Sequence, residues 1–126
     1  MTTPKKTILA MALLLLGAET ASAAQTGWIS GRDWRRVSDQ FSDQGLLPTK
    51  FECRDTLKPG LDMGAGEVRV TYTRNVNNTY WYWYATSNIT TANQELKGKG
   101  YSPVSVGSFF RKKSGLKVYC ALYYKN

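Results

Sequence analysis

Two stretches of the chain decide the fold that the sequence predicts: WRRVSDQFSDQGLLPTKF at residues 34–51 and ITTANQELKGKGYSPVSV at residues 89–106. When the two stretches are aligned with an offset of 55 residues, six positions carry residues of the same type in both. The first three matches have the i, i+3, i+7 spacing of one helix face. A glycine then stands where a helix ends, and a proline where a strand begins. Each stretch therefore predicts a helix, a Gly-x-x-Pro turn and a strand. The matched residues are Trp34, Val37, Phe41, Gly45, Pro48 and Phe51 with Ile89, Ala92, Leu96, Gly100, Pro103 and Val106.

The strands that follow each stretch are predicted to form hairpins. One hairpin joins residues 67–74 to 79–86 around the turn-rich segment 75–78, and the other joins 104–110 to 116–124 around the basic tip 111–115. With the strand that begins near Phe51, the count is five. We therefore expect an α+β domain with an antiparallel sheet of about five strands and two helices on one face. It would consist of two helix-strand-strand repeats, at about 30–86 and 87–126.

The amino-terminal segment predicts a cleaved export signal. Lys5 and Lys6 precede an apolar or small run at 8–17, and residues 21–23 are the small residues that a signal peptidase requires. A membrane-spanning helix needs about 20 apolar residues, roughly twice what is present. We expect cleavage near Ala23 and a single mature domain at 24–126. That domain would have no transmembrane segment and would be periplasmic or secreted, the alternatives being an uncleaved anchor or a buried amino-terminal helix.

The composition excludes several classes of chemistry. The 126 residues include 17 Lys plus Arg against 9 Asp plus Glu, and no histidine. Imidazole bases, Ser-His-Asp triads and histidine metal ligands are therefore excluded. The two cysteines are too few for a tetrahedral thiolate zinc site. The sequence predicts neither a metal nor a cofactor.

Strand alternation predicts which residues form the core. Pairing residue 74 with 79 in the first hairpin, and 110 with 116 in the second, gives each hairpin an apolar inner face. The predicted cross-strand pairs are Val68 with Ala85, Val70 with Trp83, Tyr72 with Trp81, Val104 with Leu122 and Val106 with Cys120.

Both cysteines fall on this inner face. Cys53 lies there beside Phe51, and Cys120 lies there in the last strand. In an oxidising compartment this placement predicts a Cys53–Cys120 disulfide that bridges the two repeats. The alternative is a pair of unbonded small core residues.

The outer face is predicted to combine tyrosines with cations, because two short helices cannot cover both sides of the sheet. Tyrosine beside Lys or Arg is suited to stacking and charge pairing, and the basic hairpin tip is open to an anionic partner. The alternative is that the tyrosines only stabilise the sheet through cross-strand pairs. The candidate binding residues are Tyr80, Tyr82, Tyr84, Arg69, Lys50, Arg54, Lys117, Tyr119, Arg111, Lys112 and Lys113, with Tyr123 on the same face.

These features favour an exported, non-enzymatic binding protein whose partner is an anionic envelope polymer or an acidic protein. Nucleic acid, or a second copy bound through the exposed sheet face, are further candidate partners. One alternative is an inhibitor or immunity-like protein of a periplasmic or secreted enzyme. Another is a small histidine-free hydrolase, for which Glu52 is the best single candidate. No residue is assigned a catalytic role.

The carboxyl-terminal third resembles a known repeat. The segments QELKGKGYSPVSV at 94–106 and YCALYY at 119–124 are similar to the short tandem helix-strand-strand repeat of secreted bacterial proteins, associated with polyglycine hydrolase-like proteins. The resemblance covers about forty residues, and more loosely 34–54. It implies the repeat architecture and transfers no catalytic residue. The chain departs from the pattern in having two units, a glycine-rich insertion and a pair of cysteines.

Overall fold

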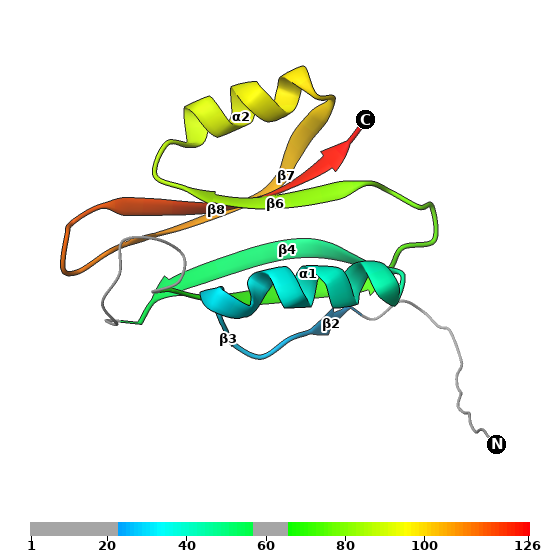
Figure 1. The fold of residues 1–126 in the computed structure, drawn as a ribbon, viewed down its shortest axis with the longest axis horizontal. Coiled ribbons are helices and arrows are strands. Elements are labelled where there is room, and N and C mark those ends of the chain that lie inside the picture. The colour runs from blue at the N-terminus through cyan, green and yellow to red at the C-terminus, as the bar shows by residue number, and fades with distance from the viewer. Residues whose placement is uncertain (1–22, 57–65) are drawn as a thin grey trace.

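The computed structural model describes residues 23–56 and 66–126, so most of the expected export signal lies outside the described residues. The described elements are two α-helices of ten residues each, one 3-10 turn and strands of two to ten residues (Figure 1). In chain order they are β2 (Ala24–Gln25), β3 (Ile29–Ser30), a 3-10 turn (Gly31–Asp33), α1 (Trp34–Asp43), β4 (Leu46–Asp55), β5 (Gly66–Arg74), β6 (Trp81–Thr86), α2 (Ile89–Gly98), β7 (Tyr101–Phe110) and β8 (Lys117–Lys125).

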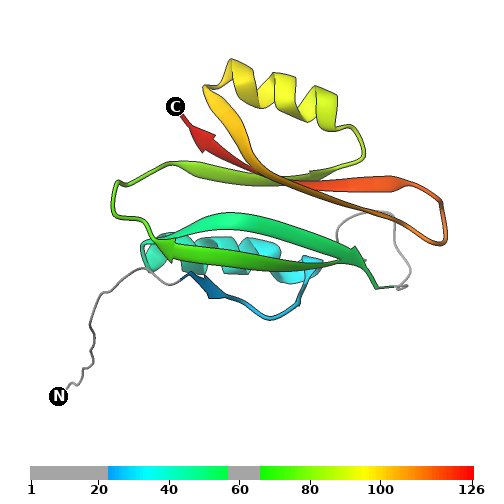
Figure 2. The same ribbon diagram turned by 180° about the vertical axis from the view of Figure 1, so that it is seen from behind.

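The strands form two antiparallel sheets. In the four-stranded sheet β5 is central: β4 pairs with one edge, and β2 and β3 pair in succession along the other. The three-stranded sheet has the order β6-β8-β7. The α+β class is therefore confirmed, whereas the expectation of one five-stranded sheet is wrong. Helix α2 lies on one side of the three-stranded sheet, and α1 with the four-stranded sheet lies on the other (Figures 1 and 2).

The predicted hairpin of residues 67–74 with 79–86 does not form. Both edges of β5 are already occupied, so β6 pairs with β8 instead. The connection after β5 is shaped by Asn75, whose side-chain amide donates to the Thr79 carbonyl (2.9 Å) and whose side-chain oxygen accepts from the Thr79 N–H (2.8 Å). This connection leads the chain from one sheet to the other.

The last hairpin forms, with a register one residue away from the predicted one. Val106 faces Ala121 and Gly107 faces Cys120. The physical reason is the turn: the Arg111 N–H donates to the Leu116 carbonyl (2.8 Å), and Gly115 takes a left-handed φ of 70°. Val106 consequently points outward and is 50% exposed, although it was expected on the inner face. Val104, also expected there, is 45% exposed.

Strand β8 separates two hydrophobic cores. Its residues Cys120 and Leu122 pack against α1, β4, β5 and Trp83, whereas Ala121 and Tyr123 pack under α2. Tyr123 was expected on the open outer face, but it is fully buried and its hydroxyl donates to the Asn93 side-chain oxygen at 2.6 Å. Burial raises the pKa of this tyrosine. The helix faces that close the two cores are Val37 and Phe41 in α1, and Ala92 and Leu96 in α2.

The two helices and the strands that follow them have matching positions. Both α1 and α2 have ten residues, both β4 and β7 have ten, and each member of the second pair lies 55 residues after the first. Each helix is followed by a glycine of positive φ, Gly45 at 66° and Gly100 at 88°. Each strand has a register shift directly after its proline, Pro48 or Pro103.

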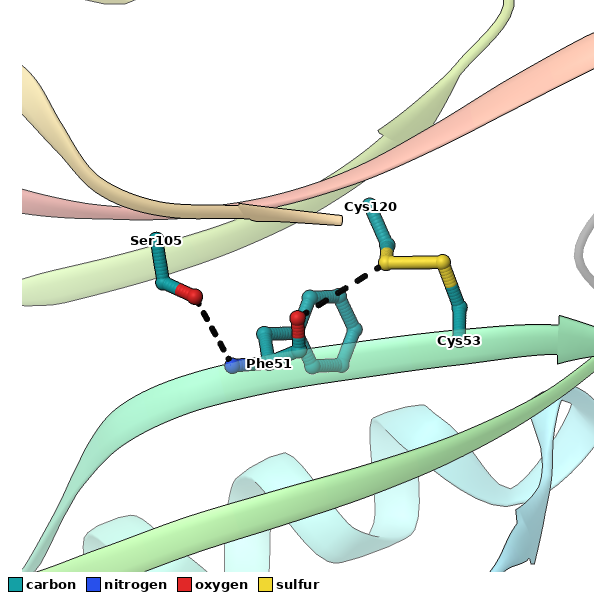
Figure 3. Close-up of a disulfide and its surroundings, with 4 residues drawn as sticks. All are labelled: Phe51, Cys53, Ser105 and Cys120. Carbon is teal, nitrogen blue, oxygen red and sulfur yellow. Dashed lines mark hydrogen bonds between the residues drawn. A yellow bond between two sulfur atoms is a disulfide. The ribbon is translucent and has the colours of Figure 1, made fainter. Parts of the chain in front are cut away.

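The disulfide between Cys53 and Cys120 is present and joins the two sheets (Figure 3). It links β4 to β8 across a sequence separation of 67 residues. Close by, the Phe51 N–H donates to the Ser105 Oγ (3.1 Å), and the Cys120 Sγ lies 3.8 Å from the Phe51 carbonyl oxygen. The Tyr124 hydroxyl also donates to the Pro48 carbonyl (2.6 Å), so the disulfide and these two hydrogen bonds connect β4 to the three-stranded sheet.

Replacing both cysteines with alanine should lower the free energy of unfolding by about 4 kcal/mol, because the crosslink restricts a long loop of the unfolded chain. Urea unfolding of the variant measures the loss. Wild-type protein unfolded in excess reductant is the control, and it should show a similar loss with no change of core volume. A loss below about 1 kcal/mol in both would contradict this account of the crosslink.

Candidate functional site

A groove of about 680 Å³ lies between α1 and the edge strand β6. Its walls come from four parts of the chain: the exposed side of α1, the turn after it, the connection between the two sheets, and β6 with the start of β7. The lining residues are Trp34, Arg35, Ser38 and Ser42, then Gly45 and Leu46, then Asn75, Asn78 and Thr79, and finally Tyr80, Trp81, Tyr82, Trp83 and Tyr101.

The position of β6 in its sheet explains why this groove is so aromatic. Strand β6 is an edge strand, so side chains of both parities border the groove. Trp81 and Trp83 point to the core side, where Trp83 stacks on Trp34 with ring centroids 6.0 Å apart. Tyr80 and Tyr82 alternate with the two tryptophans along the chain, and they are 68% and 45% exposed. Two exposed tyrosines therefore border an indole wall that the core holds in place.

One end of the groove is formed where α1 stops. The Asn75 N–H donates to the carbonyl of Gly45 (2.9 Å), which fastens the inter-sheet connection to the end of the helix. Asn78, in the same connection, has a positive φ of 51°. Because Asn75 also holds Thr79 through its side chain, this end has a defined shape.

The charge of the groove is weakly positive. Among the described residues that line it, Arg35 carries the only charge, and the remaining polar groups are hydroxyls and amides. The Lys125 Nζ adds a cation beside the rim, 5.9 Å from the ring centres of both Tyr80 and Tyr101. Flat rings, neutral hydrogen-bonding groups and nearby cations can hold a ligand by stacking and charge pairing.

The predicted binding residues lie in separate places. Tyr80 and Tyr82 line the groove, whereas Tyr84 packs partly beneath α2. Lys117 and Tyr119 lie on β8 toward the tip of the last hairpin, with the Lys117 Nζ 5.2 Å from the centre of the Tyr119 ring. The cations Lys50, Arg54 and Arg69 belong to the other sheet.

These three cations of the four-stranded sheet are paired with carboxylates. Arg69 and Lys50 both contact Glu52, at 2.8 and 3.5 Å, and Arg54 contacts Glu67 at 2.9 Å. The Trp28 ring also lies 4.1 Å from the Arg54 guanidinium carbon. Two carboxylates therefore offset two of these three positive charges, which leaves a weak net charge for an anionic polymer.

Glu52 belongs to that network. The hydrogen bond from Arg69 lowers the pKa of this carboxyl below its ordinary value. A general acid would need a raised pKa, so the environment of Glu52 suits a charge-pairing role.

Arg111 is placed differently from its neighbours at the hairpin tip. It is 3% exposed, and its guanidinium donates to the Asp55 Oδ1 at 2.9 Å. The Lys112 N–H donates to the other oxygen of the same carboxylate (3.1 Å). The exposed cations of the tip are therefore Lys112 and Lys113, while Arg111 anchors the tip to β4.

Sequence reasoning missed the part of the site that α1 contributes. Trp34 and Trp81 were expected in the core, and Arg35 was not among the candidate binding residues. The sequence does contain one signal for this site, the unbroken aromatic run YWYWY at residues 80–84. Consecutive residues of a strand point to opposite faces, so this run suits an edge strand whose two faces both contact other parts of the protein.

Comparisons with protein-family models, with curated proteins and with solved structures found no match to this chain. Within the described residues, no helix is both long and apolar enough to span a membrane.

Removing one member of the Asp55–Arg111 pair should be costly. Arg111→Met leaves a carboxylate at a mostly buried position, so the free energy of unfolding should fall by roughly 3 kcal/mol in urea unfolding. Arg54→Met, which breaks the more exposed pair with Glu67, is the matched control and should cost less than about 1 kcal/mol. Equal losses in the two variants would contradict an anchoring role for Arg111.

The Glu52 pair should make stability sensitive to acid. Because the pKa of Glu52 is lower in the folded protein than in the unfolded chain, its stabilisation is present above the ordinary carboxyl pKa. It is lost as pH falls through the folded pKa. Glu52→Gln should therefore flatten the acid side of a stability-against-pH curve measured by thermal unfolding. Glu95→Gln is the control. A curve unchanged by Glu52→Gln would reject this role.

Proposed function

We propose that this protein is an exported, non-enzymatic binding protein that holds an anionic polymer in the groove between α1 and β6. The observation that carries the proposal is the combination of an indole wall, the exposed rings of Tyr80 and Tyr82, and Arg35 as the charged residue of the lining. A polymer chain would lie with flat parts of its repeating units against the rings and with its anionic groups near Arg35 and Lys125.

The packing of the aromatic rings holds the binding surface in one conformation before a ligand binds. Trp34 and Trp83 are fixed by stacking within the core, and Tyr82 stacks on Tyr84 with ring centroids 6.1 Å apart. Side chains that are already ordered lose little conformational entropy when a ligand binds. Residues 24–126 carry 15 Lys plus Arg against 8 Asp plus Glu, and this net charge of +7 would add long-range attraction for a polyanion.

The proposed location of the protein is outside the cytoplasm. It is supported by the Cys53–Cys120 disulfide, since such bonds persist in oxidising environments, and by the signal-like pattern of the first residues. The natural ligand would then be an anionic polymer of the cell envelope or its surroundings.

We also propose that the two halves of the domain are copies of one helix-strand-strand unit. The matching lengths, the glycines of positive φ and the register shifts after Pro48 and Pro103 support this origin. In this scheme the groove is lined almost wholly by the first copy, to which α1 and β6 both belong, and among the described residues Tyr101 is the lining residue that comes from the second copy.

Replacing Tyr80 and Tyr82 with alanine should weaken polymer binding about tenfold. Each stacking contact contributes about 0.5–1.5 kcal/mol, and about 1.4 kcal/mol is tenfold in affinity. Polygalacturonate is a suitable acidic polysaccharide probe, followed by tryptophan emission, since three of the four Trp residues line the groove. Arg35→Glu should weaken binding further, and added salt should weaken it in the wild type.

The matched control is Tyr119→Ala, a tyrosine of the same sheet outside the groove. It should leave the affinity unchanged. An equal loss in Tyr119→Ala, or unchanged binding in a folded Tyr80→Ala/Tyr82→Ala variant, would reject the groove as the site. Preference for poly-L-glutamate would favour an acidic protein as partner. A salt-resistant one-to-one complex with an envelope enzyme would favour the inhibitor alternative.

A further inference from the structure

The β7–β8 hairpin ends in a set of exposed apolar side chains. Phe110, the last residue of β7, is 63% exposed, and Leu116, which follows the turn, is 42% exposed. Val104 and Val106 continue the apolar surface along β7. Figures 1 and 2 show that this hairpin extends past α2 to one end of the molecule. The apolar groups are therefore presented at a protruding edge.

Lysines surround the same tip. Lys112 and Lys113 are exposed in the turn between Phe110 and Leu116. The Lys117 Nζ lies 5.4 Å from the centre of the Phe110 ring. Residues 101–126 contain five Lys or Arg and no Asp or Glu. The nearest acidic group that contacts the tip, Asp55, is occupied by the buried Arg111 and by the Lys112 N–H. Among the residues that the structure describes, the exposed charges of the tip are therefore all positive.

The backbone holds these groups in a fixed arrangement. The Arg111 N–H donates to the Leu116 carbonyl, and the Gly115 N–H donates to the Arg111 carbonyl (2.7 Å). The buried ion pair with Asp55 anchors the turn to β4. Exposed aromatic and aliphatic groups thus stand beside exposed ammonium groups on a braced turn.

We propose that this hairpin tip docks the protein on an anionic phospholipid surface. Phe110 and Leu116 enter the boundary between headgroups and acyl chains, while Lys112, Lys113 and Lys117 pair with acidic headgroups. The charge argues against a second copy as the occupant, since two such tips would bring like charges together. The protruding shape suits insertion between headgroups. This site is distinct from the groove and does not depend on the proposed polymer binding.

Co-sedimentation with vesicles tests the proposal on the protein purified in its naturally processed form. Binding to vesicles of phosphatidylglycerol and phosphatidylcholine at low salt should be at least about tenfold stronger than binding to phosphatidylcholine alone. The Phe110→Ser/Leu116→Ser variant should lose about tenfold in partitioning. The Lys112→Gln/Lys113→Gln variant should lose the preference for anionic vesicles and most of the salt dependence.

Each variant has a matched control. Val76→Ser changes an apolar residue that is 78% exposed in the inter-sheet connection, and Lys97→Gln/Lys99→Gln removes two exposed lysines at the end of α2. Both should bind vesicles as the wild type does, and so should Tyr80→Ala/Tyr82→Ala. Circular dichroism confirms that each variant is folded. Equal binding to the two vesicle types, or equal losses in tip and control variants, would overturn the proposal. So would tip variants that lose binding to poly-L-glutamate while keeping the vesicle affinity.

Discussion

The fold depends on one strand that is buried on both sides. Strand β8 sends Val118, Cys120 and Leu122 into the core shared with α1 and the four-stranded sheet, and Ala121 and Tyr123 into the core beneath α2. A strand in this position must be central, so β6 and β7 become the flanking strands. Both surfaces of functional interest follow from that order, because the groove borders β6 and the lysine-rich tip terminates the β7–β8 hairpin.

The buried faces of β5 and β6 could be predicted from the sequence, but the partners of these strands and the buried face of β7 could not. Alternation places Val68, Val70 and Trp83 on inner faces, and all three are buried. Alternation is a local property of one strand, so it survives a wrong choice of partner. β6 cannot pair with β5 because segments distant in sequence occupy both edges of β5. The residues of the segment 67–86 do not show that those edges are occupied. The register of the last hairpin depended on the conformation of Gly115.

The candidate site was predictable only in part for a similar reason. Tyr80 and Tyr82 were assigned to an exposed face and line the groove. The groove also needs Trp34 and Arg35, which come from a helix more than forty residues earlier. A basic cluster such as 111–113 looks uniform in sequence, yet Arg111 is buried against Asp55 while its neighbours are exposed. Only the three-dimensional position of Asp55 separates the anchoring cation from the two solvent-facing ones.

The double burial of β8 also constrains the order in which the chain acquires its structure. This strand is the last along the chain, and it contacts β6, β7 and, through the disulfide, β4. Neither hydrophobic core can close before residues 117–125 have emerged from the ribosome. Pairing that spans such long sequence separations is slow, because loop entropy is lost before the contacts form. Both cores therefore close only when β8 joins them, and until then α1 and α2 lack the strand on which their buried faces pack.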